Sequence, residues 1–178
     1  MSTRSLTAVV MVLLAVLGYT HSMAQEKPNL GRPAKPAEVA GWDISIPPDG
    51  TGLPPGSGTP EQGAVVYAQK CQVCHGEKGA GKPNDQLVGG QGTLASADPV
   101  RTIGSYWPYA TTVFDYVRRA MPYTQPQSLT HDEVYAVTAY LLQLNGIIGA
   151  QDVINAQTLP RVQMPNREHF ILAYPPPK

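Results

Sequence analysis

The pattern of apolar and polar positions predicts a first helix over residues 60–70. Thr59 is a good helix-capping residue, and Gln62, three positions later, completes a capping box with it. Gly63 and Tyr67 are spaced by four, so they lie on the same face of this helix. The helix ends where the two cysteines of the chain begin.

Two further helices are predicted downstream. One is expected over residues 112–120. The other begins after Thr130 as its cap, has Glu133 as the capping-box partner, and ends near Leu144, where Gly146 can close it. The residues predicted to face inward from these two helices are Val113, Phe114, Val117, Val134, Val137, Leu141 and Leu144.

Residues 59–146 are therefore predicted to form one compact, all-α domain, with extended proline-rich arms at residues 25–58 and 147–178. Proline fixes its own φ and lacks an N–H donor, so the first arm is not expected to form a helix or a central strand. Both arms carry apolar side chains, which are Trp42, Ile44, Ile46, Met164, Phe170, Ile171, Leu172 and Tyr174. Apolar groups are rarely left in water, so the arms either wrap a partner protein or fold back over the domain's own surface.

Residues 1–24 have the pattern of a secretory signal peptide. Arg4 supplies a positive start, residues 6–17 form an uncharged apolar run, and the small residues Ser22 and Ala24 suit cleavage after Ala24. The run is shorter than the roughly 20 residues of a spanning helix, although an uncleaved membrane anchor is the alternative. No later segment is apolar enough to span a bilayer, so we expect a mature periplasmic protein without a membrane span.

The charge of the chain limits its partners. It has 13 basic and 13 acidic side chains, and its formal net charge is zero. Nucleic-acid phosphates demand a basic surface, so a nucleic-acid partner is not expected. Any electrostatic docking must come from local patches.

The sequence Cys71-Gln-Val-Cys74-His75 is the strongest chemical signal in the chain. C-x-x-C-H marks the attachment of a c-type haem. At the end of a helix, Cys71 and Cys74 lie on the same side, so both thiols reach the two vinyl groups along one porphyrin edge. His75 then comes under the ring with its imidazole toward the iron. The motif predicts one covalently attached haem c, held by Cys71 and Cys74 and ligated by His75.

Three other interpretations of the two cysteines are weaker. A thioredoxin-like redox pair needs a βαβ setting, and no strand pattern precedes Cys71. A structural zinc site needs four ligands, and beyond the motif only His131 and His169 remain in the mature chain. A simple disulfide leaves His75 unexplained.

A histidine-ligated haem that transfers electrons needs a second axial ligand, usually a methionine sulfur. Met121 is the predicted ligand, because it directly follows a predicted helix and precedes Pro122, which stiffens the loop. Met164 in the second arm and His131 are the alternatives, and either methionine could instead fill space in the core.

Over the predicted domain the chain resembles a class I cytochrome c. In that family a glycine and an aromatic residue precede the first cysteine by eight and four positions, which Gly63 and Tyr67 match. They pack against an apolar and an aromatic residue on the last helix, matched by Val137 and Tyr140. The resemblance implies a fold of three to five short helices around one haem. It also implies a loop proline, matched by Pro83, whose carbonyl holds the axial histidine.

A closer resemblance extends into the flanking sequence. Residues 41–50, 104–112 and 118–122 are similar to the SoxD-type cytochrome subunits of Sox sulfane or sulfite dehydrogenases. That resemblance implies a molybdenum-containing partner subunit that oxidises a sulfur compound by two electrons. The cytochrome would remove the electrons singly and pass them to a soluble cytochrome. Some members carry two haems, whereas this chain has a single C-x-x-C-H motif.

The sequence also suggests roles for residues around the haem. Arg101, Tyr106 and Trp107 are candidates to hydrogen-bond the haem propionates, and the alternative is that this loop covers the haem edge without touching a propionate. Arg118 and Arg119 are interpreted as a solvated face.

The expected function is therefore electron transfer as a non-catalytic subunit of an oxidoreductase complex. A free-standing soluble carrier is the alternative. A haem enzyme such as a peroxidase is a third class, but it needs an open iron position, which Met121 would close.

Overall fold

The computed structural model describes residues 30–171, 173 and 174. The predicted signal peptide and Leu172 lie outside the described residues. The chain divides into two compact units, with the boundary after Gly41. The second unit, from Trp42 onward, carries all the features that bear on function.

Three helices form the framework of the second unit: α3 (Pro60–Lys70), α5 (Ala110–Ala120) and α6 (His131–Leu144). Thr59 and Thr130 each accept a hydrogen bond from the backbone N–H three residues later, which confirms both predicted capping boxes. The predicted start of the middle helix at residue 112 is two residues late. Its cap, Tyr109, makes no side-chain capping bond, so the sequence carried no start signal there.

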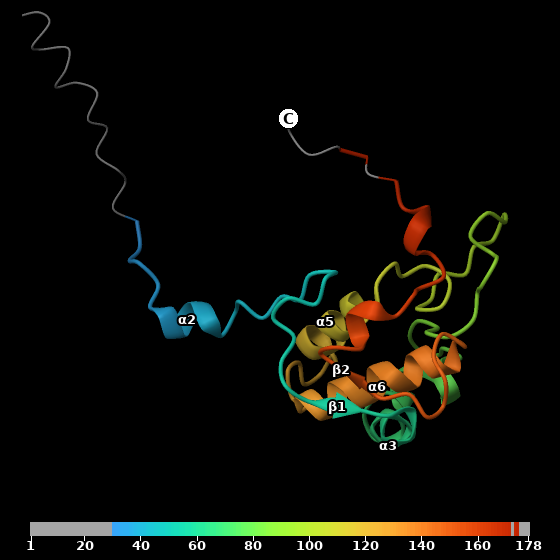
Figure 1. Ribbon diagram of the computed structural model, residues 1–178, viewed down its shortest axis with the longest axis horizontal. Helices are drawn as coiled ribbons and strands as arrows, with labels where there is room; N and C mark the ends of the chain where they lie inside the picture. The colour runs from blue at the N-terminus through green and yellow to red at the C-terminus, as the bar shows by residue number, and fades with distance from the viewer. Residues whose placement is uncertain (1–29, 172, 175–178) are drawn as a thin grey trace, which may run out of the picture. The chain divides into compact units, whose positions relative to one another are not determined.

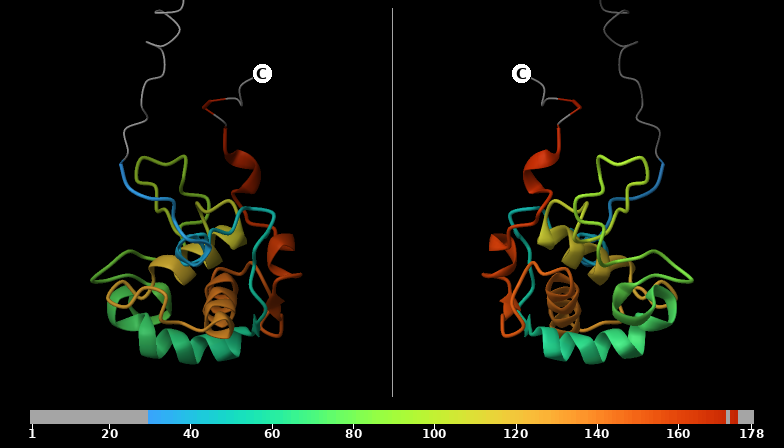
Figure 2. Two further views of the ribbon diagram at one scale, coloured as in Figure 1. Left: turned by 90° about the vertical axis from the view of Figure 1, so that its left-hand side faces the viewer. Right: turned by 90° about the vertical axis from the view of Figure 1, so that its right-hand side faces the viewer.

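Figure 1 shows α3 nearly end-on and α6 lengthwise, and Figure 2 shows the reverse, so the two helices cross at a steep angle. Gly63 lies at this crossing, and a Cβ there would come within 1.9 Å of the Ala136 carbonyl oxygen and 2.7 Å of Tyr140 Cβ. Close approach of the two helices thus requires glycine. The prediction of Tyr140 as a partner is confirmed, but the nearest apolar neighbour of Gly63 is Ala136 rather than Val137.

Helix α6 is buried on nearly every side. Six consecutive residues from Val134 to Ala139 are buried, and so are Leu141 and Leu142, whereas Leu144 is only half-buried. The prediction of a single inward stripe was therefore too narrow. A further layer of the chain therefore covers α6, in addition to α3 and α5.

That covering layer comes from the chain's two flanks. Strand β1 (Ser57–Gly58) pairs antiparallel with β2 (Ile154–Asn155), and Figure 1 shows both lying beside α6. The chain continues through the short 3₁₀ helices η2 (Leu159–Arg161) and η3 (Arg167–His169). Side chains of this stretch that join the core are Ile154, Leu159 and Met164.

Residues 44–48 are held against the rest of the second unit by α5. Asp115 accepts a hydrogen bond from the backbone N–H of Ile46 at 2.9 Å, and Ile46 is buried. Arg118 donates to the carbonyl of Ile44, and Arg119 donates to the hydroxyl of Ser45. Both arginines therefore bind residues 44 and 45, while Arg119 stays exposed, as expected for a solvated face, and Arg118 is half-buried.

The first unit contains one described helix, α2 (Pro36–Ala40). The prediction that this arm holds no helix is wrong, because Pro36 occupies the first helical turn, where its missing N–H costs nothing. The Glu38 carboxylate closes the turn by accepting from the backbone of Lys35 and pairing with Arg32. These contacts hold the pKa of Glu38 at about 2, with Arg32 as the main cause.

Across the residues that the structure describes, no helix is long and apolar enough to cross a membrane.

Candidate functional site

The cysteine motif lies where one helix ends and the next begins. Cys71 caps the end of α3, and the single turn α4 (Gln72–His75) follows it. The backbone N–H groups of Cys74 and His75 both donate to the carbonyl of Cys71, at 3.1 and 3.0 Å. This turn places Cys71, Cys74 and His75 on one short stretch of hydrogen-bonded backbone.

Both cysteines are free thiols in the structure, not a disulfide. Burial, and to a smaller extent the neighbouring Cys74, raises the pKa of the Cys71 thiol to about 11. Redox pairs of the thioredoxin type instead lower a cysteine pKa to make a reactive thiolate. A neutral, half-buried Cys71 therefore argues against thiol–disulfide exchange.

The imidazole of His75 is oriented by a backbone carbonyl. Its Nδ1 lies 2.9 Å from the carbonyl oxygen of Asp85. Because a carbonyl only accepts, Nδ1 carries the proton, and the lone pair of Nε2 is free to bind a metal. The prediction that the Pro83 carbonyl plays this role is wrong. Residues 82–84 form a tight turn in which Lys82 N–H donates to Asn84 O at 2.8 Å, and the chain reaches His75 only after that turn.

A second set of contacts shapes the loop beside His75. The Tyr67 hydroxyl donates to the carbonyl of Gly76 at 2.8 Å, and the Tyr67 and Tyr140 rings pack with centroids 5.4 Å apart. Gly76 has φ of +73°, and a Cβ there would lie 2.3 Å from the carbonyl oxygen of Gly81. Burial raises the pKa of Tyr67 to about 12. These contacts link the buried α3–α6 crossing to the turn that carries the motif.

The candidate sixth ligands lie in different surroundings. Met121 caps the end of α5 and is half-buried. Met164 is buried within the hydrophobic core, 4% exposed, where it fills space. His131 is the first residue of α6 and is exposed. The choice of Met121 as the sixth ligand stays a prediction. The core position of Met164 gives this methionine of the second arm, residues 147–178, a packing role.

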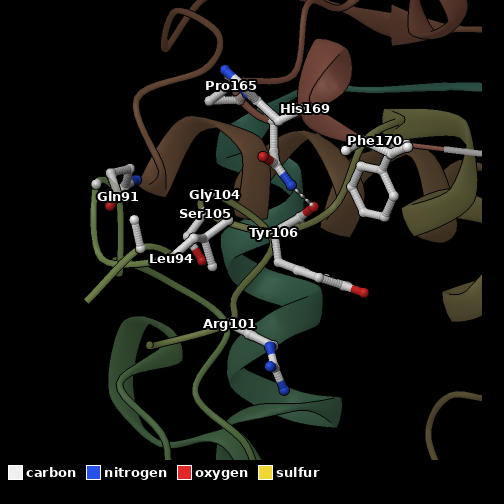
Figure 3. Close-up of a pocket in the computed structure, with 13 residues that line it drawn as sticks. Gln91, Leu94, Arg101, Gly104, Ser105, Tyr106, Pro165, His169 and Phe170 are labelled. Atoms are coloured by element: carbon white, nitrogen blue, oxygen red, sulfur yellow. Dashed lines mark hydrogen bonds between the residues drawn. The ribbon is translucent and has the colours of Figure 1, made fainter. Parts of the chain in front are cut away.

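The three residues predicted to lie near the haem propionates, Arg101, Tyr106 and Trp107, do not all line the same pocket. Arg101 and Tyr106 line a pocket of about 710 Å³ between the 91–106 loop and the chain near η3, shown in Figure 3. The guanidinium of Arg101 lies 5.9 Å from the centre of the Tyr106 ring. Trp107 instead packs against Tyr116, with ring centres 5.7 Å apart.

The far wall of this pocket is the chain after Met164. Asn166 donates through Nδ2 to the backbone carbonyl of Tyr106 at 2.8 Å, the bond dashed in Figure 3. Phe170 stacks edge-on against the Tyr106 ring, with centres 5.4 Å apart. The second flank therefore helps to build the loop that was predicted to face the propionates.

The motif residues fit a c-type haem. Two free thiols three residues apart and an imidazole with a free Nε2 match the donors that such a haem requires. Within the described part of the chain, no three His, Cys, Asp or Glu side chains are placed to hold a metal ion, which removes the zinc alternative there.

Comparison with known proteins places the chain in a family. The family model for subunit III of the cbb3-type cytochrome c oxidases matches residues 58–141. A chain in the crystal structure of the sulfane dehydrogenase SoxCD from Paracoccus pantotrophus is similar to this chain, with 44% sequence identity and a TM-score of 0.76. The match covers 82% of this chain and 72% of that chain. The chain is a SoxD-like class I c-type cytochrome. A comparison with curated proteins gave no match.

Membership of this family confirms the predicted all-α, class I cytochrome c fold, and a cytochrome c domain implies haem c as the cofactor. Sequence reasoning missed two residues of this SoxD-like cytochrome. Asp85 acts through its backbone carbonyl, which no side-chain pattern reveals. Asn145, directly after α6, looked like an ordinary residue before the closing Gly146, yet it is buried.

Proposed function

We propose that this SoxD-like cytochrome is the monohaem electron-transfer subunit of a periplasmic sulfur-compound dehydrogenase. The observation that carries the proposal is the oriented motif of Cys71, Cys74 and His75 in a chain 44% identical to a sulfane dehydrogenase structure. A haem iron alternates between two oxidation states and so accepts and releases one electron at a time.

The chain's own residues perform three tasks in this proposal. Cys71 and Cys74 would hold the haem covalently through their sulfur atoms, one to each vinyl group. His75 offers Nε2 to the iron, because Asp85 holds Nδ1. Met121, the half-buried residue at the end of α5, would supply a thioether sulfur as the second iron ligand.

The partner in this proposal is a molybdenum-containing subunit. It oxidises a sulfane or sulfite substrate by two electrons, which this chain takes one at a time and gives to a soluble cytochrome. The exposed apolar side chains of the flanks are the proposed docking elements. They are Trp42, Phe170, Ile171 and Tyr174, with exposures of 85, 48, 92 and 90%.

Haem attachment tests the first part of the proposal. The protein should keep its haem stain after denaturation, and Cys71→Ala combined with Cys74→Ala should abolish it. A stain that survives the double change would sink the assignment. The matched control is Val73→Ala, which alters an exposed side chain between the two cysteines and should leave the stain intact.

A free-standing carrier is the second candidate, because the structure weakens one objection to it. Ile46, Ile154, Leu159 and Met164 are buried against the chain's own core, so most of the flanking sequence has a role without any partner. Co-purification with the wild-type chain and with a chain ending at residue 168 separates the two functions. Loss of the molybdenum subunit with an unchanged haem spectrum supports docking, whereas a wild-type chain that purifies alone supports the carrier.

A further inference from the structure

Asn145 lies at the centre of a buried hydrogen-bond network at the end of α6. Its side chain is 8% exposed. Its Nδ2 donates to the carbonyls of Leu141 at 2.9 Å and Leu87 at 3.2 Å, and its Oδ1 accepts from the backbone N–H of Gly89 at 3.0 Å. One amide thus binds a helix end and a loop that lies more than fifty positions earlier in the sequence.

The loop is fixed from its other side as well. The carbonyl of Leu87 also accepts from the backbone N–H of Ile103 at 3.3 Å, and the carbonyl of Gly89 accepts from the Thr102 hydroxyl. Gly104 must be a glycine here, because a Cβ would come within 2.2 Å of Asn145 Oδ1. Leu87 and Gly89 are therefore clamped between the end of α6 and the 102–104 turn.

This clamp lies two residues from the carbonyl that orients the motif histidine. Asp85 accepts from Nδ1 of His75, and Leu87 follows after one intervening residue. The backbone N–H of Leu87 donates to Gly79 O at 2.9 Å, which ties the same segment to the loop after α4. The position of the Asp85 carbonyl thus depends on a segment whose hydrogen bonds converge on Asn145.

We propose that Asn145 is a positioning residue for the axial histidine. By fixing Leu87 and Gly89, it holds the Asp85 carbonyl against Nδ1 of His75 and so sets how strongly Nε2 donates to the iron. The inference rests on the proposed function, because it concerns the ligand strength of His75 toward a bound haem.

The direction of the effect follows from ligand chemistry. A hydrogen bond from Nδ1–H to a carbonyl raises the basicity of Nε2. A more basic ligand favours the oxidised iron and lowers the reduction potential. Loosening the loop at Asn145 weakens that hydrogen bond, so the reduction potential should rise.

The test uses the full-length, haem-loaded protein with Asn145→Ala. Its reduction potential should rise, and the amide of Gly89 should exchange its hydrogen about tenfold faster, as expected for the loss of one buried hydrogen bond. Asn145→Leu restores side-chain volume without hydrogen bonds, so it should not return the potential to the wild-type value. The control is Tyr135→Phe, which removes a buried hydrogen bond to Pro54 and should leave the potential unchanged.

The outcomes separate the two proposals. A wild-type protein without haem would overturn the proposed function. A haem-loaded Asn145→Ala protein with fast exchange at Gly89 but an unchanged potential would overturn only the positioning role, and so would full rescue by Asn145→Leu. If Asn145→Ala does not fold, Thr102→Val removes the hydroxyl that binds Gly89 O and tests the same clamp, with a higher potential again expected.

Discussion

The crossing of α3 and α6 depends on Gly63, so Gly63→Ala is a direct test of the fold. The added methyl would lie 1.9 Å from the carbonyl oxygen of Ala136 and 2.5 Å from its carbon, where ordinary contacts are 3.4–4 Å. Both groups belong to helix backbones, which do not yield as a flexible side chain does. The helices must therefore separate, and the packed rings of Tyr67 and Tyr140 must shift with them.

Two opposing terms set the size of the effect. Overpacking of a well-packed site costs about 1–3 kcal/mol, and a clash with backbone belongs at or above the upper end of that range. Alanine gains about 1 kcal/mol over glycine in helix propensity. The net loss should be at least about 2 kcal/mol, or roughly 4–8 °C in Tm for a chain of this size.

The assay is thermal and urea unfolding followed by far-ultraviolet circular dichroism on the haem-loaded protein. Ala68→Gly is the matched control, because Ala68 is exposed on the same helix and reports propensity alone. It should lose about 1 kcal/mol. A Gly63→Ala protein as stable as the wild type, or more stable, would refute the close crossing.

Three further predictions concern the ligand, the second flank and alkaline pH. Met121→Ala should remove the weak red absorption band of the oxidised protein that reports sulfur ligation. Met164→Ala should keep this band but lose about 2–5 kcal/mol of stability, because it opens a cavity in the core. Loss of the band in Met164→Ala and its survival in Met121→Ala would contradict the choice of Met121 as ligand. Leu159→Ala should cost a similar 2–5 kcal/mol in urea unfolding, because Leu159 is fully buried, and a change below 1 kcal/mol would mean that the flank is dispensable. Burial raises the pKa of Tyr135 to about 12 from an ordinary value near 10. Because Tyr135 therefore deprotonates more readily in the unfolded chain, the stability of the fold should decrease as the pH rises from about 10 to 12. In measurements of Tm against pH, Tyr135→Phe should show a smaller decrease over this range.

The sequence predicted those parts of the fold that depend on local chemistry. The capping boxes at Thr59 and Thr130 gave two helix starts correctly, because both side chains bond to backbone within four residues. The start of α5 was missed, since Tyr109 caps without a side-chain bond. Local patterns report only contacts between neighbours in sequence.

The contacts that were missed join distant parts of the chain. Nothing in the sequence around Met164 shows that it packs in the core, and a proline-rich flank gives no periodicity from which burial follows. The same limit applies to Asp85, whose backbone carbonyl meets His75 only after the turn at residues 82–84. Site residues that act through side-chain type, such as the two cysteines, were predictable from the motif itself.

The strand pair β1–β2 has a consequence for how the protein is made. The core around α5 and α6 is complete only when Ile154 and Leu159 have joined it, and these residues come late in synthesis. A chain that stops before residue 154 would lack β2 and the core side chains of Ile154, Leu159 and Met164, and the apolar surface left exposed would attract chaperones and proteases. Because β2 pairs with a strand almost a hundred residues earlier, we expect a full-length chain to resist proteolysis better than one that ends before β2.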